Sequence, residues 1–154
     1  MNKALTIVKN QLYQTLQTLI DQRVDNAQNA MQSAESSKSS QTKSSAGDKF
    51  ETSRAMMQAE EDRNKVQLGK ALALQNDLAK VNRFTNSETA VLGSLVVTNQ
   101  GAYFLSIGIG KVKLDKTTYF AISLESPIGQ LLFGKKVGEK VSFRGKTIII
   151  EQLI

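Results

Sequence analysis

The sequence has no cysteine, no histidine and no tryptophan, and only one proline among its 154 residues. Without cysteine the chain can form neither a disulfide nor a thiolate zinc site. Without histidine it lacks the usual general base and the commonest transition-metal ligand, which excludes Ser-His-Asp and Cys-His enzymes. No apolar run approaches the roughly 20 residues that a membrane span needs, and the N-terminal residues show no signal-peptide pattern. These absences predict a cytoplasmic protein that does not associate with a membrane.

The chain carries an excess of positive charge, with a formal net charge of +6. Residues 83–154 hold nine Lys/Arg against five Asp/Glu, whereas residues 1–82 are closer to neutral. A basic balance favours acidic partners, including nucleic acid. Solubility is an equally good reason for a charge of this size.

The composition changes near Asn82, which predicts two domains. Before this position there is no proline and only two glycines, Gly47 and Gly69; eight glycines and the single proline follow it. We therefore expect residues 1–82 and 83–154 to form separate domains, with residues 83–87 as the connector. The second domain has β-branched runs, so the whole chain is predicted to be α+β.

The first domain has the spacing of a coiled coil. Leu5, Val8, Leu12, Leu16 and Leu19 follow one another at steps of three and four residues, which places them on one stripe of a helix. The apolar residues of a second helix are Met56, Met57, Ala59, Val66, Leu68, Leu72, Ala73, Leu74, Leu78 and Val81. We expect two antiparallel helices, residues 3–34 and 49–81, each about 45–50 Å long. A Ser/Lys/Gln-rich stretch, residues 36–46, should separate them. Such a hairpin could also pair with a second copy as a four-helix bundle.

The second domain reads as a small sheet. Strands are expected at residues 90–98, 102–107, 118–123, 141–143 and 147–153, with turns at 99–101 and 144–146. Tyr103 and Phe120 are expected in the core or as a cross-strand pair. Ser126 and Pro127 suit the N-cap and first position of a short helix that ends before Gly134. The prediction is a twisted antiparallel sheet with one short helix over it.

Two carboxylates stand where the second helix of the hairpin should begin. Asp48 and Glu51 are three residues apart, so they share one face of a helix, next to its N-terminus. Mg²⁺ accepts one or two such carboxylates and fills its other positions with water and phosphate oxygens. Alone the pair would bind metal weakly, but beside a metal held elsewhere it could complete a two-metal site for phosphodiester chemistry. The same spacing is a capping box, the reading that spacing alone favours.

Two stretches resemble the Gre family of bacterial transcript cleavage factors (GreA/GreB-like). Gly47-Asp48-Lys49-Phe50-Glu51 matches the family's tip Gly-Asp-x-x-Glu. Residues 122–138, which read Ile-Ser-Leu-Glu-Ser-Pro-Ile-Gly, then Gln, then Leu-Leu-Phe-Gly-Lys-Lys-Val-Gly, match its Ser-Pro-(Ile/Leu)-(Gly/Ala) and Leu-(Leu/Ile)-Gly-Lys. The resemblance covers essentially the whole chain. It implies an N-terminal coiled-coil hairpin and an FKBP-like C-terminal domain.

The resemblance also implies a function and a set of site residues. The C-terminal domain would dock on RNA polymerase at the rim of its secondary channel, and the hairpin would enter the channel. The protein would act as a monomer. Asp48 and Glu51 would then help to hold an active-site Mg²⁺ shared with the polymerase, which would itself cut the backtracked nascent RNA. The chain would not be an enzyme, and it would contact nascent RNA or DNA only within the polymerase complex. The polymerase-binding residues implied by the second match are Ser126, Pro127, Ile128, Gly129, Lys135 and Lys136. A relative that enters the channel without promoting cleavage, and a coiled-coil adaptor that dimerises, are the alternatives.

Overall fold

The computed structural model describes the backbone of residues 3–44 and 48–154 and the side chains of residues 3–36 and 51–154. The elements follow one another as α1 (Lys3–Ser44), α2 (Asp48–Ala79), β1 (Leu95–Thr98), β2 (Gly101–Leu105), β3 (Gly110–Leu114), β4 (Thr117–Ile122), α3 (Pro127–Leu132), β5 (Lys140–Phe143) and β6 (Lys146–Leu153). The predicted α+β class is confirmed. Residues 18–76 form one compact unit, and residues 1–17 together with 77–154 form the other. Among the described residues, no helix has both the length and the apolar character of a membrane span.

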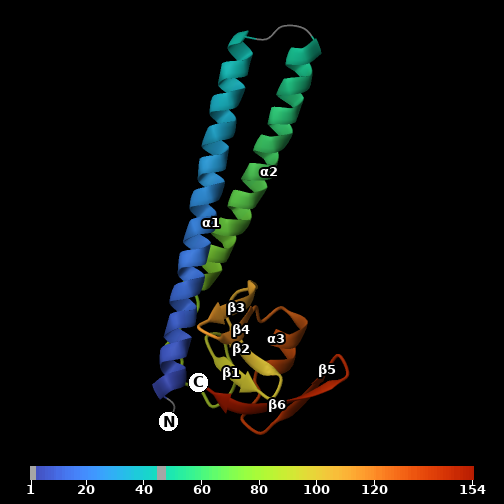
Figure 1. Cartoon of the computed structure of the whole chain (residues 1–154). Helices are drawn as coiled ribbons and strands as arrows, with labels where there is room; N and C mark the ends of the chain where they lie inside the picture. Colours follow the sequence, from blue (N-terminus) through green and yellow to red (C-terminus); the bar gives the residue numbers. More distant parts are fainter. Residues whose placement is uncertain (1–2, 45–47) are drawn as a thin grey trace. The chain divides into compact units, whose positions relative to one another are not determined.

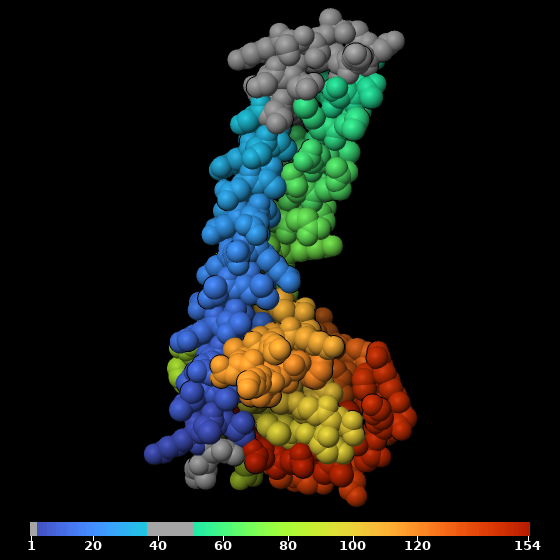
Figure 2. All heavy atoms as spheres, in the orientation of Figure 1, coloured from blue at the N-terminus to red at the C-terminus, as the bar shows by residue number. Residues whose placement is uncertain are grey.

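The unit of residues 18–76 is a helical hairpin, as predicted. α1 and α2 run antiparallel to each other (Figure 1), and their side chains meet along the arms (Figure 2). Side-chain hydrogen bonds join the helices within this unit: Gln75 Nε2 donates to Asp21 Oδ1 at 3.0 Å, and Asn64 Nδ2 donates to the carbonyl oxygen of Ala30 at 3.3 Å. Both bonds fix the register of one helix against the other.

The first helix is longer than expected. We predicted its end near Ala34, but α1 continues to Ser44, so most of the Ser/Lys/Gln-rich stretch has helical backbone. That stretch contains neither glycine nor proline before Gly47. Serine, lysine and glutamine each cost a helix no more than about 0.5 kcal/mol relative to alanine. The predicted end near Ala34 is wrong because a polar composition alone does not break a helix.

The inner faces of the two helices differ from the predicted stripes. In α1, Leu12 and Leu16 are buried as expected, and the stripe continues with Ile20 and Val24. In α2 the less exposed residues follow steps of four and three, and they are Met57, Glu61, Asn64, Leu68 and Ala71. Met56, Val66 and Leu72 are exposed instead. The polar residues on this inner face hid its periodicity from a count of apolar residues alone.

The six strands of the other unit form one sheet in the order β3-β4-β2-β1-β6-β5. Every neighbouring pair is antiparallel except β2 and β4, which are parallel, so the prediction of a fully antiparallel sheet was wrong at this pair. The cause is β3, which forms a tight hairpin with β4 and thereby turns β4 into the direction of β2. Tyr103 lies beside Phe120 in this pair, and their rings stack with centroids 5.4 Å apart. The predicted cross-strand pair is therefore confirmed.

The strand prediction was wrong in two places: one strand begins later than expected, and one strand was not predicted. Residues 90–94 are not a strand, because Gly93 has φ +96° and a Cβ there would collide with the carbonyl oxygen of Asn82. β3 was not predicted, although its alternation of exposed Lys111, buried Val112 and exposed Lys113 is typical of a strand. β3 lies at the edge of the sheet, where lysines discourage pairing with other chains.

One face of the sheet carries a core that α3 covers (Figure 1). The fully or nearly buried members of this core are Ala90, Val96, Leu105, Ile128, Leu132, Val141, Ile148 and Ile150. Ile128 and Leu132 come from α3, and all but Ala90 of the others come from strands. Burial of this area is the main stabilising contribution to the unit, and it holds α3 against the sheet.

Candidate functional site

The predicted acidic pair lies at the start of the second helix of the hairpin. α2 begins at Asp48, and Glu51 lies in its first turn with an exposed side chain. Only residues 45–47 separate this turn from the end of α1, so the pair belongs to the closed end of the hairpin. Gly47 and the side chain of Asp48 lie outside the described residues. The helical start that the spacing predicted is thus present, and Glu51 is open to a partner.

The donor set fits a shared Mg²⁺ better than a resident one. Within the described residues, no group of three or more acidic side chains could hold a metal ion. Asp48 and Glu51 offer hard oxygen ligands near the positive end of a helix dipole, where ionised carboxylates are favoured. Mg²⁺ requires about six oxygen ligands, of which a protein commonly supplies one or two carboxylates. The remaining ligands would come from water and from another molecule.

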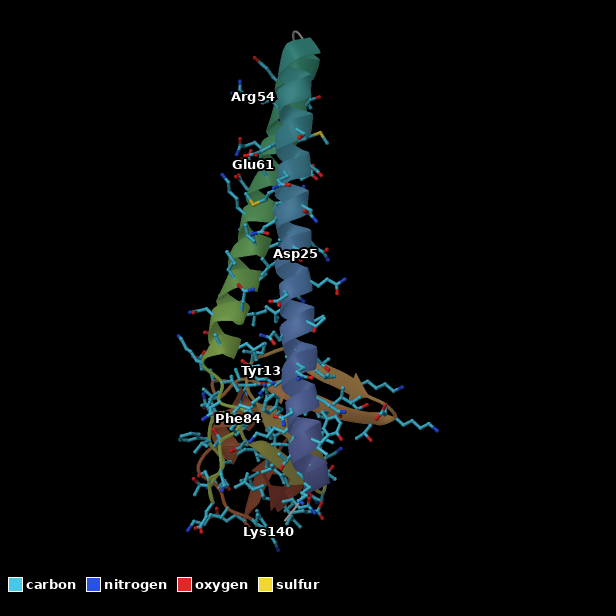
Figure 3. All side chains as sticks on the ribbon, turned by 90° about the vertical axis from the view of Figure 1, so that its left-hand side faces the viewer. Tyr13, Asp25, Arg54, Glu61, Phe84 and Lys140 are labelled. Atoms are coloured by element: carbon cyan, nitrogen blue, oxygen red, sulfur yellow. The ribbon has the colours of Figure 1, made fainter. Side chains whose placement is uncertain are left out.

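A positive charge stands next to this pair. Arg54 follows Glu51 by three residues, which places the two on the same face of α2. Its side chain is exposed and points outward from α2 (Figure 3). A cation at this spacing reduces the negative potential around Glu51.

The second predicted site is built around the start of α3. Ser126 has extended backbone angles, and its Oγ accepts a hydrogen bond from the Gly129 amide at 3.1 Å. The same hydroxyl donates to the carbonyl oxygen of Ser123 at 2.7 Å. Pro127 occupies the first helical turn, where its missing N–H costs nothing. The predicted cap is confirmed. Gly129 is required by space, since a Cβ there would collide with the Ser123 carbonyl.

The structure divides the six residues of the predicted polymerase-binding set by exposure. Ile128 and Gly129 are buried and hold the turn in place. Pro127 and Lys136 are exposed, and Ser126 and Lys135 are partly exposed. The segment after α3 also exposes two apolar side chains that the set did not include, Phe133 and Val137. A docking surface in this region would therefore be apolar at Phe133 and Val137 and positive at the two lysines.

A groove lies between the two helices of the hairpin and was not predicted. It has a volume of about 460 Å³, and its wall carries the cationic side chains of Arg23 and Lys70. Its other lining residues are Asn26, Ala27, Ala30, Asn64, Gln67, Ala71 and Leu74. The alanines leave the space, and the amides and cations line it without any carboxylate. The alanines of both helices could be read from the sequence. That Arg23 and Lys70 line the same groove depends on the register of α1 against α2, which the sequence does not give.

A buried lysine was also missed. The side chain of Lys9 is 1 % exposed, and its ammonium donates to the carbonyl oxygens of Thr85 at 3.1 Å and Ile154 at 3.0 Å. Burial lowers the pKa of Lys9 to about 8. Lys9 falls between Leu5 and Leu12 at steps of four and three, so it lies on the apolar stripe. This position could have predicted the burial of Lys9, because lysines that face solvent usually lie outside the apolar stripe of a helix.

Comparisons with known proteins give one structural likeness. No family model matches the chain, and no curated protein matches its sequence. Among solved structures, the chain is similar to the one described as "Structure of the transcription factor Gfh1", with 15% identity and a TM-score of 0.38 over 89% of this chain and 92% of that chain.

Proposed function

We propose that the chain is a Gre-like transcription elongation factor of the bacterial cytoplasm that binds RNA polymerase in its secondary channel. There it stimulates the polymerase to cleave backtracked nascent RNA. One observation carries the proposal: the two segments that resemble the Gre family each open a helix. Asp48 and Glu51 open α2 at the closed end of the hairpin, and Ser126 caps α3. Two independent motifs thus stand at helix starts, in separate units of the chain.

Docking on the polymerase is assigned to the exposed surface near α3. Pro127, Lys135 and Lys136 would contact the partner, while Ile128 and Gly129 hold the turn from inside. The lysines favour an acidic counter-surface, and charges of opposite sign speed association. The support is the specific sequence match in this segment together with the exposure of Pro127 and Lys136 and the partial exposure of Lys135.

The chemistry is assigned to the polymerase, with Asp48 and Glu51 lent to it. Mg²⁺ supplies charge neutralisation at the phosphodiester, and the two carboxylates would hold it and orient water. In this proposal the chain is not itself an enzyme, because the polymerase cleaves the RNA and the chain only supplies carboxylates to the polymerase's Mg²⁺. The groove with Arg23 and Lys70 suits the phosphates of a nascent RNA contacted within the complex.

The test is a cleavage assay on stalled, backtracked complexes with cognate polymerase. The double variant Asp48→Asn/Glu51→Gln should retain polymerase binding and reduce the rate of RNA shortening about 100-fold, the usual loss for a catalytic proton-transfer or metal-holding group. Glu60→Gln/Asp62→Asn removes the same two charges further along α2 and should cleave as wild type does. Equal rates for the two double variants would contradict the assignment.

The second candidate is a relative that occupies the channel without promoting cleavage. The exposed Arg54 beside Glu51 favours it, because it weakens the negative potential that a metal would need. In the same assay this candidate predicts equal RNA shortening with and without the wild-type protein, although binding persists. Arg54→Ala would then be expected to restore part of the stimulation.

A further inference from the structure

Two residues of the connector after α2, Arg83 and Phe84, form a stack of two aromatic rings and a cation with Tyr13 of α1. The guanidinium carbon of Arg83 lies 5.0 Å from the centroid of the Tyr13 ring and 5.0 Å from that of the Phe84 ring. Figure 3 labels Tyr13 on α1 and Phe84 on the connector. All three residues belong to the unit formed by residues 1–17 and 77–154. At this distance a cation is attracted to both ring faces.

Hydrogen bonds hold this stack in place. The Tyr13 hydroxyl donates to the Leu78 carbonyl at 3.3 Å. The Phe84 amide donates to Asn82 Oδ1 at 3.0 Å, and the Thr85 hydroxyl donates to the Asn82 carbonyl at 2.7 Å. The connector is therefore a built turn, and Phe84 is pre-positioned before any ligand arrives.

Two groups of the stack face water, the Phe84 ring and, in part, the Arg83 guanidinium. The Phe84 side chain is 71 % exposed, more than any other large hydrophobic residue among those described. Arg83 is only partly exposed, and within the described residues its guanidinium makes ring contacts but no ion pair with a carboxylate. Its N–H groups remain free to donate. A rigid apolar ring with a cation against it is the arrangement by which proteins bind nucleotides without sequence preference.

We propose that Phe84 and Arg83 form a binding platform for single-stranded nucleic acid. The exposed face of Phe84 would stack on a base, and the guanidinium of Arg83 would bind a neighbouring phosphate. The net charge of +4 over residues 83–154 favours such a polyanion. An acidic protein segment would satisfy Arg83 but would leave the flat face of Phe84 without a matching π-surface. The platform does not depend on the acidic pair or on the proposed function.

Because the chain has no tryptophan, the platform can be given its own fluorescent reporter. Phe84→Trp places a single indole at the platform, and Phe133→Trp places one at another exposed phenylalanine of the same unit. Titration with a ten-nucleotide oligothymidylate at low salt should quench the indole at position 84 and leave the one at position 133 unchanged. Equal quenching at both positions, or none at position 84, would overturn the proposal.

Affinity measurements with a fluorescently labelled form of the same oligothymidylate complete the test. Phe84→Ala should weaken binding by about 5- to 150-fold, the range for loss of one stacked base, whereas Phe133→Ala should have no effect. Arg83→Gln should reduce the slope of log affinity against log salt by about 0.7, the value for one phosphate contact on a single strand. Circular dichroism checks that each variant is folded. If Phe84→Ala weakens polymerase binding and leaves oligonucleotide binding unchanged, the platform is a protein-docking surface and the proposal fails.

Discussion

At the scale of single residues, the buried ammonium of Lys9 links distant segments of the chain through hydrogen bonds. Its ammonium reaches the carbonyl of Thr85 in the connector and that of Ile154 beyond the last strand, so one side chain joins three distant parts of the chain. The cost is desolvation of a charge, which lowers the pKa to about 8. The ordinary pKa of lysine, about 10.4 in an unfolded chain, then makes the folding free energy depend on pH.

We predict that Lys9 makes the protein more stable as the pH rises from about 8 towards 10.5. In that window the unfolded chain binds the proton and the folded chain does not, so the free energy of unfolding increases with pH. Burial raises the pKa of Tyr103, which opposes this gain near pH 10, so pH 9.5 is a suitable upper limit. Urea unfolding of the wild type and Lys9→Met at pH 7.5 and 9.5 should show a gain about 2 kcal/mol larger in the wild type. Parallel pH profiles of the two proteins would refute it.

Two glycines should respond in opposite ways to the same substitution. Gly129→Ala should destabilise the protein by about 1–3 kcal/mol, because the added Cβ would collide with the Ser123 carbonyl. Gly69 lies inside α2 with open space around it, so Gly69→Ala should stabilise the helix by about 1 kcal/mol. Thermal unfolding followed by circular dichroism measures both. A loss of stability in Gly69→Ala would show that its backbone is not helical.

At the scale of elements, local chemistry predicted the starts of helices better than their ends or their buried faces. The start of α3 followed from Ser126 and Pro127 alone, because a cap is made by neighbours in sequence. The inner face of α2 did not follow, since Glu61 and Asn64 occupy it. Asn64 is satisfied there by the carbonyl of Ala30, a contact 34 residues away that no local pattern reveals. The parallel pairing of β2 with β4 was missed for a similar reason: it depends on β3.

The cap of α3 gives a prediction at this scale. Ser126→Ala removes the acceptor for the Gly129 amide and should lower the free energy of unfolding by about 1 kcal/mol. Ser126→Thr keeps a hydroxyl that can accept from the Gly129 amide and donate to the Ser123 carbonyl, so it should recover most of the loss. Chemical denaturation of the three proteins measures the difference. If alanine and threonine at position 126 behave alike, the cap contributes nothing to stability.

At the scale of the whole molecule, the candidate sites differ in how far the sequence could reveal them. Asp48 and Glu51 are close in sequence, so their spacing at a helix start was enough. The platform of Arg83 needs Tyr13, which lies 70 residues away along the chain. It could only be found once α1 and the connector were placed together in one unit. The role of the acidic pair is harder to predict than its position, because the pair is proposed to act in the active site of another molecule.

The absence of cysteine allows the position of the acidic pair in the polymerase complex to be measured directly. Thr52→Cys, next to Glu51, would carry a photoactivated cross-linker into backtracked complexes with cognate polymerase, and Lys140→Cys, at an exposed position of β5, would serve as the comparison. The account predicts that position 52 cross-links to the polymerase segment that holds the catalytic Mg²⁺, or to the 3′ end of the nascent RNA, and that position 140 does not. Cross-links from position 52 only to the outer surface of the polymerase would contradict it.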